Sequence, residues 1–291
     1  MANRRAIVKR RKSVRNIKKI TRTMQLIATA RFQAAMNRAV ASRPYTDKLA
    51  ELVTDLGRAA GDLRHPLLEV RDPERRSALL VLTSTRGLAG GYNAHVHRAA
   101  FEHLDRQAAA GVSTDVWMVG KKGASAFRFR NRPMARTLAS LEDKPRYEQV
   151  EPWASELIEA FAEGRIDAVD VAYMRFESAG KQSAEVVRVL PIARPQGGGE
   201  EAAGPRPQYE IRPDPGELLG RLLPATVRMR VYQAFLDAAV SEQIFRMTAM
   251  KAATEAADEM IGDLTRQYNR ARQTQITLEL LDIVGGANAL A

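Results

Sequence analysis

One hydrophobic repeat constrains the folding of this 291-residue chain more than any other feature. Near the C-terminal end, apolar or small residues alternate steps of three and four, which places one on the same face every 3.5 residues. This is the repeat of a coiled coil, and a stripe of this length needs a second helix to cover it. The stripe consists of Met247, Met250, Thr254, Ala257, Ile261, Leu264, Tyr268, Ala271, Gln275 and Leu278.

A second helical pattern occupies the N-terminal end. Steps of three and four place one stripe on a helix, at Val14, Ile17, Ile20, Met24, Ile27 and Ala28. After Pro44 the pattern resumes, and it stops near Gly57 and Gly61. Because proline removes one helical hydrogen bond and restricts the residue before it, we expect a kink or a short break near Arg43.

The C-terminal helix is expected to begin at about Pro213, with Pro224 as a potential interruption, and to end at the glycines of "GGANALA". Helices of about 50 and about 70 residues would each extend roughly 75 to 100 Å. A domain of this size has no core that deep, so we expect the two helices to cover each other as an antiparallel pair. A compact helical bundle is the alternative.

The middle of the chain has a different period. Strands are predicted at "SALLVLTS", "TDVWMVG", "AVDVAYMRF" and "AEVVRVLPI", and helices at "YNAHVHRAAFEHL", "KKGASAFRF" and "EPWASELIEAFAEG". Alternating strands and helices predict a parallel or mixed sheet covered by helices. The stretch "RPQGGGEEAAGPRP" predicts a mobile loop.

The predicted fold class is therefore α/β with long helices. An antiparallel coiled coil is formed by an N-terminal helix in residues 1–61 and a C-terminal helix in residues 213–291. A central Rossmann-like α/β domain occupies residues 62–212.

The formal net charge is +11, and the first twenty residues, "MANRRAIVKRRKSVRNIKKI", contain no acidic residue. Such a surplus favours a negatively charged partner, which includes nucleic acid, an anionic membrane and an acidic protein surface. A mitochondrial transit peptide is also rich in arginine and poor in acids, but this segment lacks serine enrichment and its apolar spacing continues downstream. Without an aromatic stacking platform, a solvated or acid-facing surface explains the charge at least as well as nucleic acid does.

Motifs for catalysis or cofactor binding are missing from the sequence. Gly87, Gly90 and Gly91 match neither a P-loop nor the GxGxxG fingerprint, which favours a tight turn over nucleotide binding. Gly120 and Gly123 flank two lysines and also indicate a turn. No GxSxG elbow or distinct carboxylate pair occurs, and Ser84 and Thr85 are interpreted as turn residues.

Metal sites and membrane spans are not indicated either. The four histidines form no ligand cluster, so we expect surface roles for His65, His95, His97 and His103. The sequence has no cysteine, which excludes disulfides and thiolate metal sites. No run approaches the roughly 20 apolar residues that a bilayer span requires. We expect no cofactor, no metal and no catalysis by this chain alone.

Four stretches of the chain resemble a known family. They are "KSVRNIKKITRTMQLIATARFQAA", "TSTRGLAGGYNAHV", "VGKKGA" and "RMTAMKAATEAADEMIGDLTRQYNRARQTQITLELLDIVGGANAL". Together they resemble, in the right order and over essentially the whole chain, the gamma subunits of the rotary F-type ATP synthases.

The resemblance implies a non-catalytic central-stalk subunit. In that family the two terminal helices form a coiled coil inside a ring of three alpha and three beta subunits. The α/β domain lies at the foot of this shaft, against the epsilon subunit and the membrane-embedded ring of c subunits. Ion flow through the c-ring turns the shaft, which couples that flow to ATP synthesis or hydrolysis in the hexamer. The resemblance implies no nucleic-acid partner.

The resemblance also assigns contact residues. Met24 and Arg246 fall where the shaft faces the acidic lever segment of the beta subunit, and Arg272, Gln273 and Thr277 fall where the C-terminal helix meets loops of the hexamer. Without the family, simple coiled-coil packing would explain Met24, and a solvated charge would explain Arg246. The implied location is peripheral, on the cytoplasmic face of the bacterial inner membrane, with an organellar inner membrane as the alternative.

The chain departs from the family pattern at several positions. In the first-strand motif, Thr85, Ala89 and Tyr92 replace the usual acid, cysteine and phenylalanine. Gln25 and Leu26 follow Met24 where the family commonly has Glu-Met, and Leu278 replaces a glutamine. These differences preserve the expected fold and bear on details of the hexamer contacts, and they would suit a divergent second copy of the complex or a dedicated ATP-driven pump.

Overall fold

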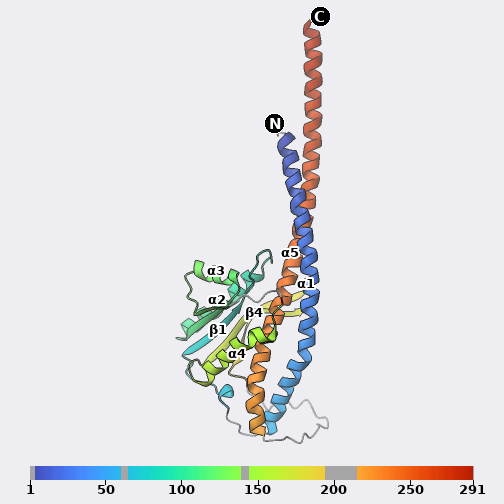
Figure 1. The fold of residues 1–291 in the computed structure, drawn as a ribbon. Coiled ribbons are helices and arrows are strands. Elements are labelled where there is room, and N and C mark those ends of the chain that lie inside the picture. Colours follow the sequence, from blue (N-terminus) through green and yellow to red (C-terminus); the bar gives the residue numbers. More distant parts are fainter. Residues whose placement is uncertain (1–3, 60–64, 139–143, 194–214, 291) are drawn as a thin grey trace. The chain divides into compact units, whose positions relative to one another are not determined.

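The computed structural model describes residues 4–59, 65–138, 144–193 and 215–290 (Figure 1). The described chain divides into two compact units. We call residues 4–29 together with 246–290 the helical unit, and residues 30–245 the sheet unit. The predicted domain limits at residues 61 and 212, and the predicted loop that begins at Arg194, lie outside the described residues.

Two long helices, α1 (Arg4–Ala59) and α5 (Pro215–Leu290), pass through both units. In the helical unit they lie side by side and antiparallel, as predicted (Figure 1). Their apolar seam buries Ile7 and Val14 of α1 against Ala257 and Leu264 of α5. As far as Ala271 the 3.5-residue repeat is therefore the contact face of a real helix pair, whereas its last two members, Gln275 and Leu278, are exposed.

Neither proline interrupts its helix, and the C-terminal glycines do not end α5. Pro44 lies inside α1 and Pro224 lies inside α5, and α5 also continues through Gly285 to Leu290. An interior proline costs about 3 kcal/mol. Burial of Leu49 and Leu56 in the turns after Pro44 offsets that cost. Glycine weakens a helix without ending it unless the backbone changes conformation there.

The sheet unit contains a mixed five-stranded sheet, as the alternation of strands and helices predicted. Its strands are β1 (Arg76–Leu82), β2 (Ser113–Val119), β3 (Arg136–Leu138), β4 (Ala168–Ser178) and β5 (Lys181–Leu190). The order is β3-β2-β1-β4-β5, with β1 parallel to both β2 and β4, β2 parallel to β3, and β5 antiparallel to β4. The three-residue β3 was not predicted, because so short a strand has no readable period.

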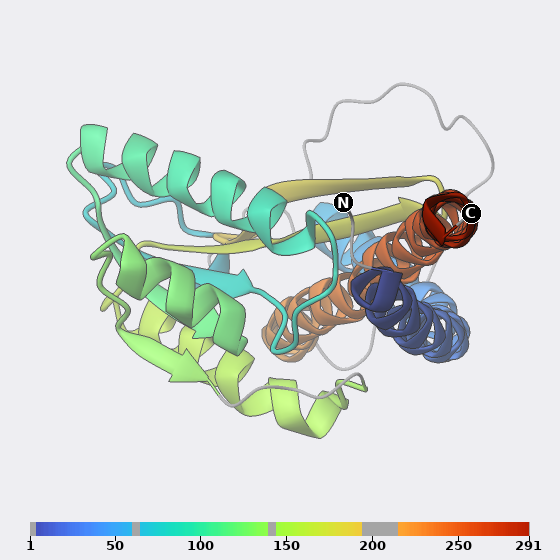
Figure 2. The same cartoon turned by 90° about the horizontal axis from the view of Figure 1, so that it is seen from above.

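Helices cover both faces of this sheet (Figure 2). Besides the short η1 (Pro66–Leu68), the sheet unit contains α2 (Tyr92–Ala109), α3 (Lys121–Phe129) and α4 (Tyr147–Ala162). Successive side chains of a strand point to opposite faces, so Leu79 and Val81 pack with α2 and α3 whereas Leu80 packs with α4 and α5. None of the described helices contains a stretch apolar enough to span a bilayer.

Gly120 allows the end of β1 to approach the start of α3. Its φ is +93°, and a Cβ atom there would lie 2.1 Å from the carbonyl oxygen of Thr83. Gly123 is equally constrained, because its Cβ would lie 2.5 Å from Thr83 Oγ1, the atom that accepts a hydrogen bond from the Gly123 amide. The glycines of "VGKKGA" are therefore required by close packing at a turn.

Replacing Gly120 with alanine should strongly destabilise the sheet unit. We expect Gly120→Ala to lower the free energy of unfolding by about 3 kcal/mol or more, since overpacking adds to positive-φ strain. Gly111→Ala is the matched control, because Gly111 has φ +76° and a Cβ atom there would meet no other atom within 4 Å. That control should cost about 1 kcal/mol, measured by urea denaturation with tryptophan fluorescence. Equal losses in both variants would disprove the steric explanation.

Candidate functional site

The five predicted contact residues all lie in the helical unit, but they do not form one site. Met24 is half-buried on α1, and Arg246 is only 6% exposed on α5. Arg272, Gln273 and Thr277 are exposed on α5, beyond Ala271, where the described seam with α1 ends. The 26 residues from Arg246 to Arg272 span about 39 Å of helix. The predicted contacts therefore occupy two levels of the same helix.

Burial of Arg246 rules out the simpler interpretation of this residue as a solvated charge. Arg246 packs against the rest of the chain, since only 6% of the residue is exposed.

The N-terminal stripe was only partly predicted. Within the helical unit, the buried positions of α1 are Ile7, Val14, Thr21 and Ala28, which are seven residues apart. Three members of the predicted stripe are instead exposed, namely Ile17, Ile20 and Ile27. Isoleucines on steps of three and four form a second apolar face, which α5 does not cover. The interior seam has Ile7, Val14, Thr21 and Ala28 in their place.

The far end of α5 has a cluster of exposed apolar side chains. The exposed fractions of Leu280, Leu281, Ile283 and Val284 range from 55% to 69%. No described residue of the chain covers these side chains, because the packed seam ends at Ala271. Contiguous exposed apolar side chains on a helix indicate a surface that another protein covers.

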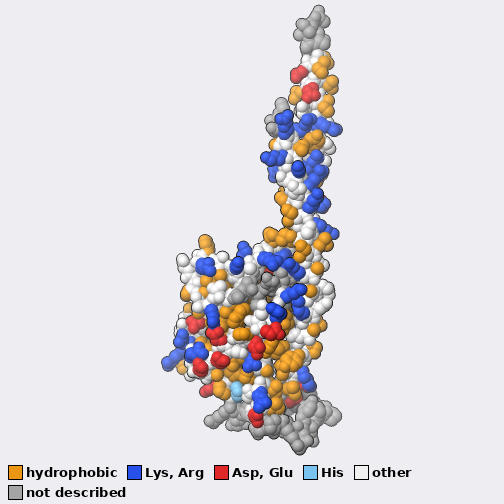
Figure 3. Space-filling model, viewed as in Figure 1, with side chains coloured by type: hydrophobic (Ala, Val, Ile, Leu, Met, Phe, Trp, Pro, Cys, Tyr) orange, Lys and Arg blue, Asp and Glu red, His pale blue; other side chains and the backbone are white. Residues whose placement is uncertain are grey.

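Basic side chains gather along the α1 part of the helical unit on the face shown in Figure 3. Between Arg4 and Arg22, α1 contains no acidic residue, and most of its Lys and Arg side chains are exposed. Lys18 forms an ion pair with Asp258 of α5 at 2.5 Å, and Arg11 lies over the Tyr268 ring at 5.0 Å. These contacts confirm the antiparallel arrangement and leave a positive surface that suits an acidic partner.

A buried polar contact also joins the two helices. Thr21 Oγ1 and Thr254 Oγ1 lie 2.8 Å apart, at hydrogen-bond distance, and each hydroxyl also lies near a carbonyl oxygen of its own helix, that of Lys18 at 3.1 Å and that of Met250 at 2.7 Å. Both threonines are less than 10% exposed. Thr254 was assigned to the seam from the sequence, but Thr21 was not. The seven-residue spacing of Ile7, Val14 and Ala28 is the signal that identifies it.

The glycine-containing loop after β1 forms the predicted tight turn. Asn93 Oδ1 accepts a hydrogen bond from the Ser84 amide, Ser84 Oγ donates to the Arg86 carbonyl, and Gly90 has φ +51°. A pocket of about 240 Å³ lies beside this loop at the ends of β1 and β2. It is smaller than the roughly 300–1,000 Å³ typical of cofactor pockets. The geometry of this loop therefore favours a structural role.

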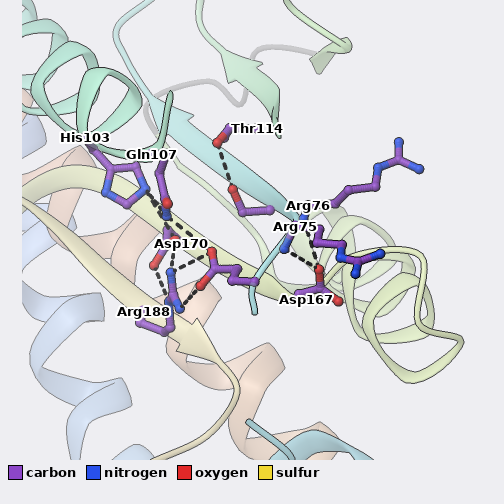
Figure 4. Close-up of polar contacts among 10 residues, drawn as sticks. Arg75, Arg76, His103, Gln107, Thr114, Asp167, Asp170 and Arg188 are labelled. Carbon is purple, nitrogen blue, oxygen red and sulfur yellow. Dashed lines mark hydrogen bonds and ion pairs between the residues drawn. The ribbon is translucent and has the colours of Figure 1, made fainter. Parts of the chain in front are cut away.

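A buried ionic cluster contradicts the expected surface role of His103 (Figure 4). Asp170 of β4 is 3% exposed, and its carboxylate accepts two hydrogen bonds of 2.9 Å from Arg188 of β5. His103 Nε2 of α2 lies 3.3 Å from the same carboxylate, and Arg188 also donates to Glu74 at 2.7 Å. Burial alone would raise the pKa of Asp170, but the bonds from His103 and Arg188 outweigh it and lower the pKa.

This cluster is built for stability. It joins α2, β4, β5 and the segment before β1, and its charges are paired with one another. Among the described residues, no group of three or more His, Asp or Glu side chains is arranged to hold a metal ion. His65 also packs locally, since its Nδ1 accepts a hydrogen bond from the Leu67 amide.

Removing the Asp170 charge should change how stability depends on pH. Because the pKa of Asp170 is lowered by folding, its contribution is present above its unfolded pKa of about 3.9 and is lost as pH falls through the folded value. We expect Asp170→Asn to cost about 3 kcal/mol at neutral pH and to lose less further stability below pH 4 than the parent chain.

The exposed pair of Asp115 with Arg76 provides the control for this experiment. Asp115→Asn should cost less than about 1 kcal/mol at neutral pH, because exposed ion pairs contribute little. Urea denaturation of both variants between about pH 2.5 and pH 8 measures the two profiles. An Asp170→Asn profile parallel to that of the parent would show that the pKa of Asp170 is not lowered by folding.

Comparison with known proteins gives a consistent result over the full length of the chain. A family model described as ATP synthase matches residues 3–290. The ATP synthase gamma chain of Rhodopirellula baltica is 43% identical over 296 residues, covering 100% of this chain and 99% of the relative. The ATP synthase gamma chain of Leptospira biflexa is 38% identical and covers 100% of both chains.

The fold is shared with a solved structure. A chain in the Euglena gracilis mitochondrial ATP synthase structure, described as OSCP/F1/c-ring, has a TM-score of 0.64 and 16% identity. The match covers 99% of this chain and 94% of that chain. At this identity the likeness establishes the fold of paired terminal helices with an α/β domain.

Proposed function

The chain belongs to the family of ATP synthase gamma chains, and we propose that it acts as the rotating central shaft of an F-type ATP synthase. As a gamma chain it is a non-catalytic subunit. The observation that carries the proposal is the far end of α5, where exposed leucine, isoleucine and valine side chains extend past the seam with α1. Such a surface suits an apolar sleeve formed by surrounding subunits.

The proposed partners are three alpha and three beta subunits around one copy of this chain. Met24 and Arg246 would face the acidic lever segment of the beta subunit, and Arg272, Gln273 and Thr277 would meet loops of the hexamer. Support comes from the separation of these two groups by about 39 Å of one helix, which allows contact at two levels of an enclosing ring. The positive surface of α1 supports an acidic counterpart.

Coupling of shaft rotation to catalysis would then depend on contacts that differ among the three surrounding sites. A shaft that is not three-fold symmetric presents a different face to each of three surrounding sites, so rotation favours a different conformation of each site in turn. The chain needs no nucleophile, metal or cofactor for this role. It needs two helices that move together and side chains that contact the ring.

The sheet unit would lie at the foot of the shaft, against the epsilon subunit and the c-ring. The chain would thus be peripheral to the membrane, on the cytoplasmic face of a bacterial inner membrane. The bacterial sources of the relatives named above support this location over an organellar one. Nucleic acid is not a proposed partner.

Co-expression with the alpha and beta subunits from the same source tests this function. Native mass spectrometry should find one copy of this chain per three alpha and three beta subunits, and ATPase activity should depend on its presence. Arg246→Glu should lower that activity about tenfold, because it replaces an attraction to the acidic lever with repulsion.

Two controls separate contact from folding in this experiment. Lys251→Glu reverses an exposed charge on the same helix, five residues away, and should leave activity within about twofold. Thermal unfolding of each isolated variant measures any loss of stability from altering the buried Arg246. A parent chain that stays alone, or elutes with nucleic acid, would overturn the proposed function.

The tip of α5 should tolerate truncation. Gln275 Nε2 donates to Glu279 of its own helix at 2.7 Å, and Thr277 donates to the Gln273 carbonyl at 3.0 Å. These polar groups are satisfied within α5, which suits a tip that slides with low friction. We expect a chain lacking residues 277–291 to assemble and to retain ATPase activity within a few-fold. Complete loss of assembly would show that the tip is needed for binding.

A further inference from the structure

The apolar pattern of the helical unit does not fix how far its helices are shifted along each other. The α5 seam repeats every seven residues, and the α1 seam does so through Ile7, Val14 and Ala28. A shift by one heptad, about 10 Å, would again place apolar positions opposite apolar positions. Register in such a repeat needs a feature that occurs once in the seam.

Thr21 and Thr254 provide that feature. They are 233 residues apart in the chain, yet their hydroxyl oxygens lie 2.8 Å apart inside the seam. Thr21 is 9% exposed and Thr254 is 7% exposed, so water does not readily replace the missing partner of either hydroxyl. Thr254 Oγ1 also lies 2.7 Å from the Met250 carbonyl oxygen of its own helix.

A one-heptad shift would break this contact in either direction. In one direction Thr21 would lie opposite Ile261, and Thr254 would lie opposite Ala28. In the other direction Thr254 would lie opposite Val14. Each hydroxyl would keep the carbonyl oxygen of its own helix but lose its cross-helix partner and face apolar side chains, so the shift would cost the one hydrogen bond that joins the two helices.

Two further contacts favour the same register, but they stabilise it less than the threonine hydrogen bond does. The ion pair of Lys18 with Asp258 is substantially exposed, with side-chain exposures of 39% and 53%, so solvent weakens it. Arg11 lies over the Tyr268 ring, 5.0 Å from its centre. Both contacts lie in the same antiparallel register as the threonine pair.

We propose that the Thr21–Thr254 hydrogen bond locks the register of α1 and α5 in the helical unit. The two threonines are positioning residues that make the helices turn as one body. The consequence for coupling rests on the proposed shaft function. Helices that slid along each other would take up rotation as internal displacement and would not pass it to the surrounding subunits.

Distances between two spin labels on the isolated full-length chain test the lock directly. Arg15→Cys and Glu279→Cys place the labels on exposed positions of α1 and α5, and the absence of native cysteine makes labelling specific. In the observed register the labelled positions lie roughly 28 Å apart along the helix axis, and a one-heptad slip changes this by about 10 Å. Pulsed electron paramagnetic resonance resolves such a change.

The parent chain should give one distance. The double variant Thr21→Val with Thr254→Val removes both hydroxyls at nearly constant volume, and we expect the slipped population to rise at least fivefold. Thr21→Ser with Thr254→Ser keeps the hydroxyls and should restore a single distance. An unchanged distance in the valine variant would overturn the lock, and would mean that anchorage of the same helices in the sheet unit sets the register.

Two other threonines provide the matched control. Thr23 donates to the Lys19 carbonyl and Thr265 donates to the Ile261 carbonyl, each within its own helix. Thr23→Val with Thr265→Val therefore removes the same number of hydroxyls without touching a cross-helix bond. A slipped population in this control equal to that of the Thr21→Val, Thr254→Val variant would also count against the proposal.

Reconstitution with the alpha, beta, epsilon and membrane subunits tests the functional consequence. The valine variant should hydrolyse ATP near the parent rate but pump several-fold fewer ions per ATP. Full coupling despite a slipped population would overturn the consequence for rotation. Failure of the parent chain to assemble would overturn the shaft function, while the label distances on the isolated chain would still decide the lock.

Discussion

Mutual burial of two apolar stripes is the interaction on which the helical unit depends. Neither stripe has another described helix to cover it, so Ile7 and Val14 of α1 are shielded from water only because Ala257 and Leu264 of α5 lie against them. The interface uses one narrow face of each helix. The remaining faces are left to contact other molecules, and they carry both exposed isoleucines and a dense positive charge.

In the sheet unit, the same two helices pack against one face of the sheet. Val53 and Leu56 of α1, with Val227 and Val231 of α5, belong to the core on one face of the sheet. Polar groups of this unit bind its elements to one another, as the pairing of Asp170 with Arg188 illustrates. This arrangement leaves the exposed helix faces available for contact, which agrees with membership of a non-catalytic subunit family.

Much of this architecture could be predicted from local patterns. The 3.5-residue repeat identified the helix pair, and alternating strand and helix segments identified the mixed sheet. The errors came where two solutions share one pattern. Ile17 and Ile20 satisfy a helical stripe as well as Val14 does, yet only Val14 faces α5. Proline and glycine were given too much weight as helix breakers, because local signals do not include the burial that offsets their cost.

The candidate contact residues show the same difference between what the sequence predicts and what only the fold reveals. Family motifs identified these residues from the sequence alone, namely Met24, Arg246, Arg272, Gln273 and Thr277. Only the fold shows that Arg246 is almost fully buried while Arg272 is exposed and lies about 39 Å further along the helix. Their contacts in an assembled complex remain predictions.

The sequence by itself determined the two long helices, their apolar repeat, the strand segments and the family motifs. All of these depend on residues within a few positions of one another. The tertiary structure alone decided which apolar face is internal, that His103 joins Asp170, and that Thr21 meets Thr254 across 233 residues. The physical reason is that a repeating stripe is compatible with several registers, and only contacts between distant segments select one of them.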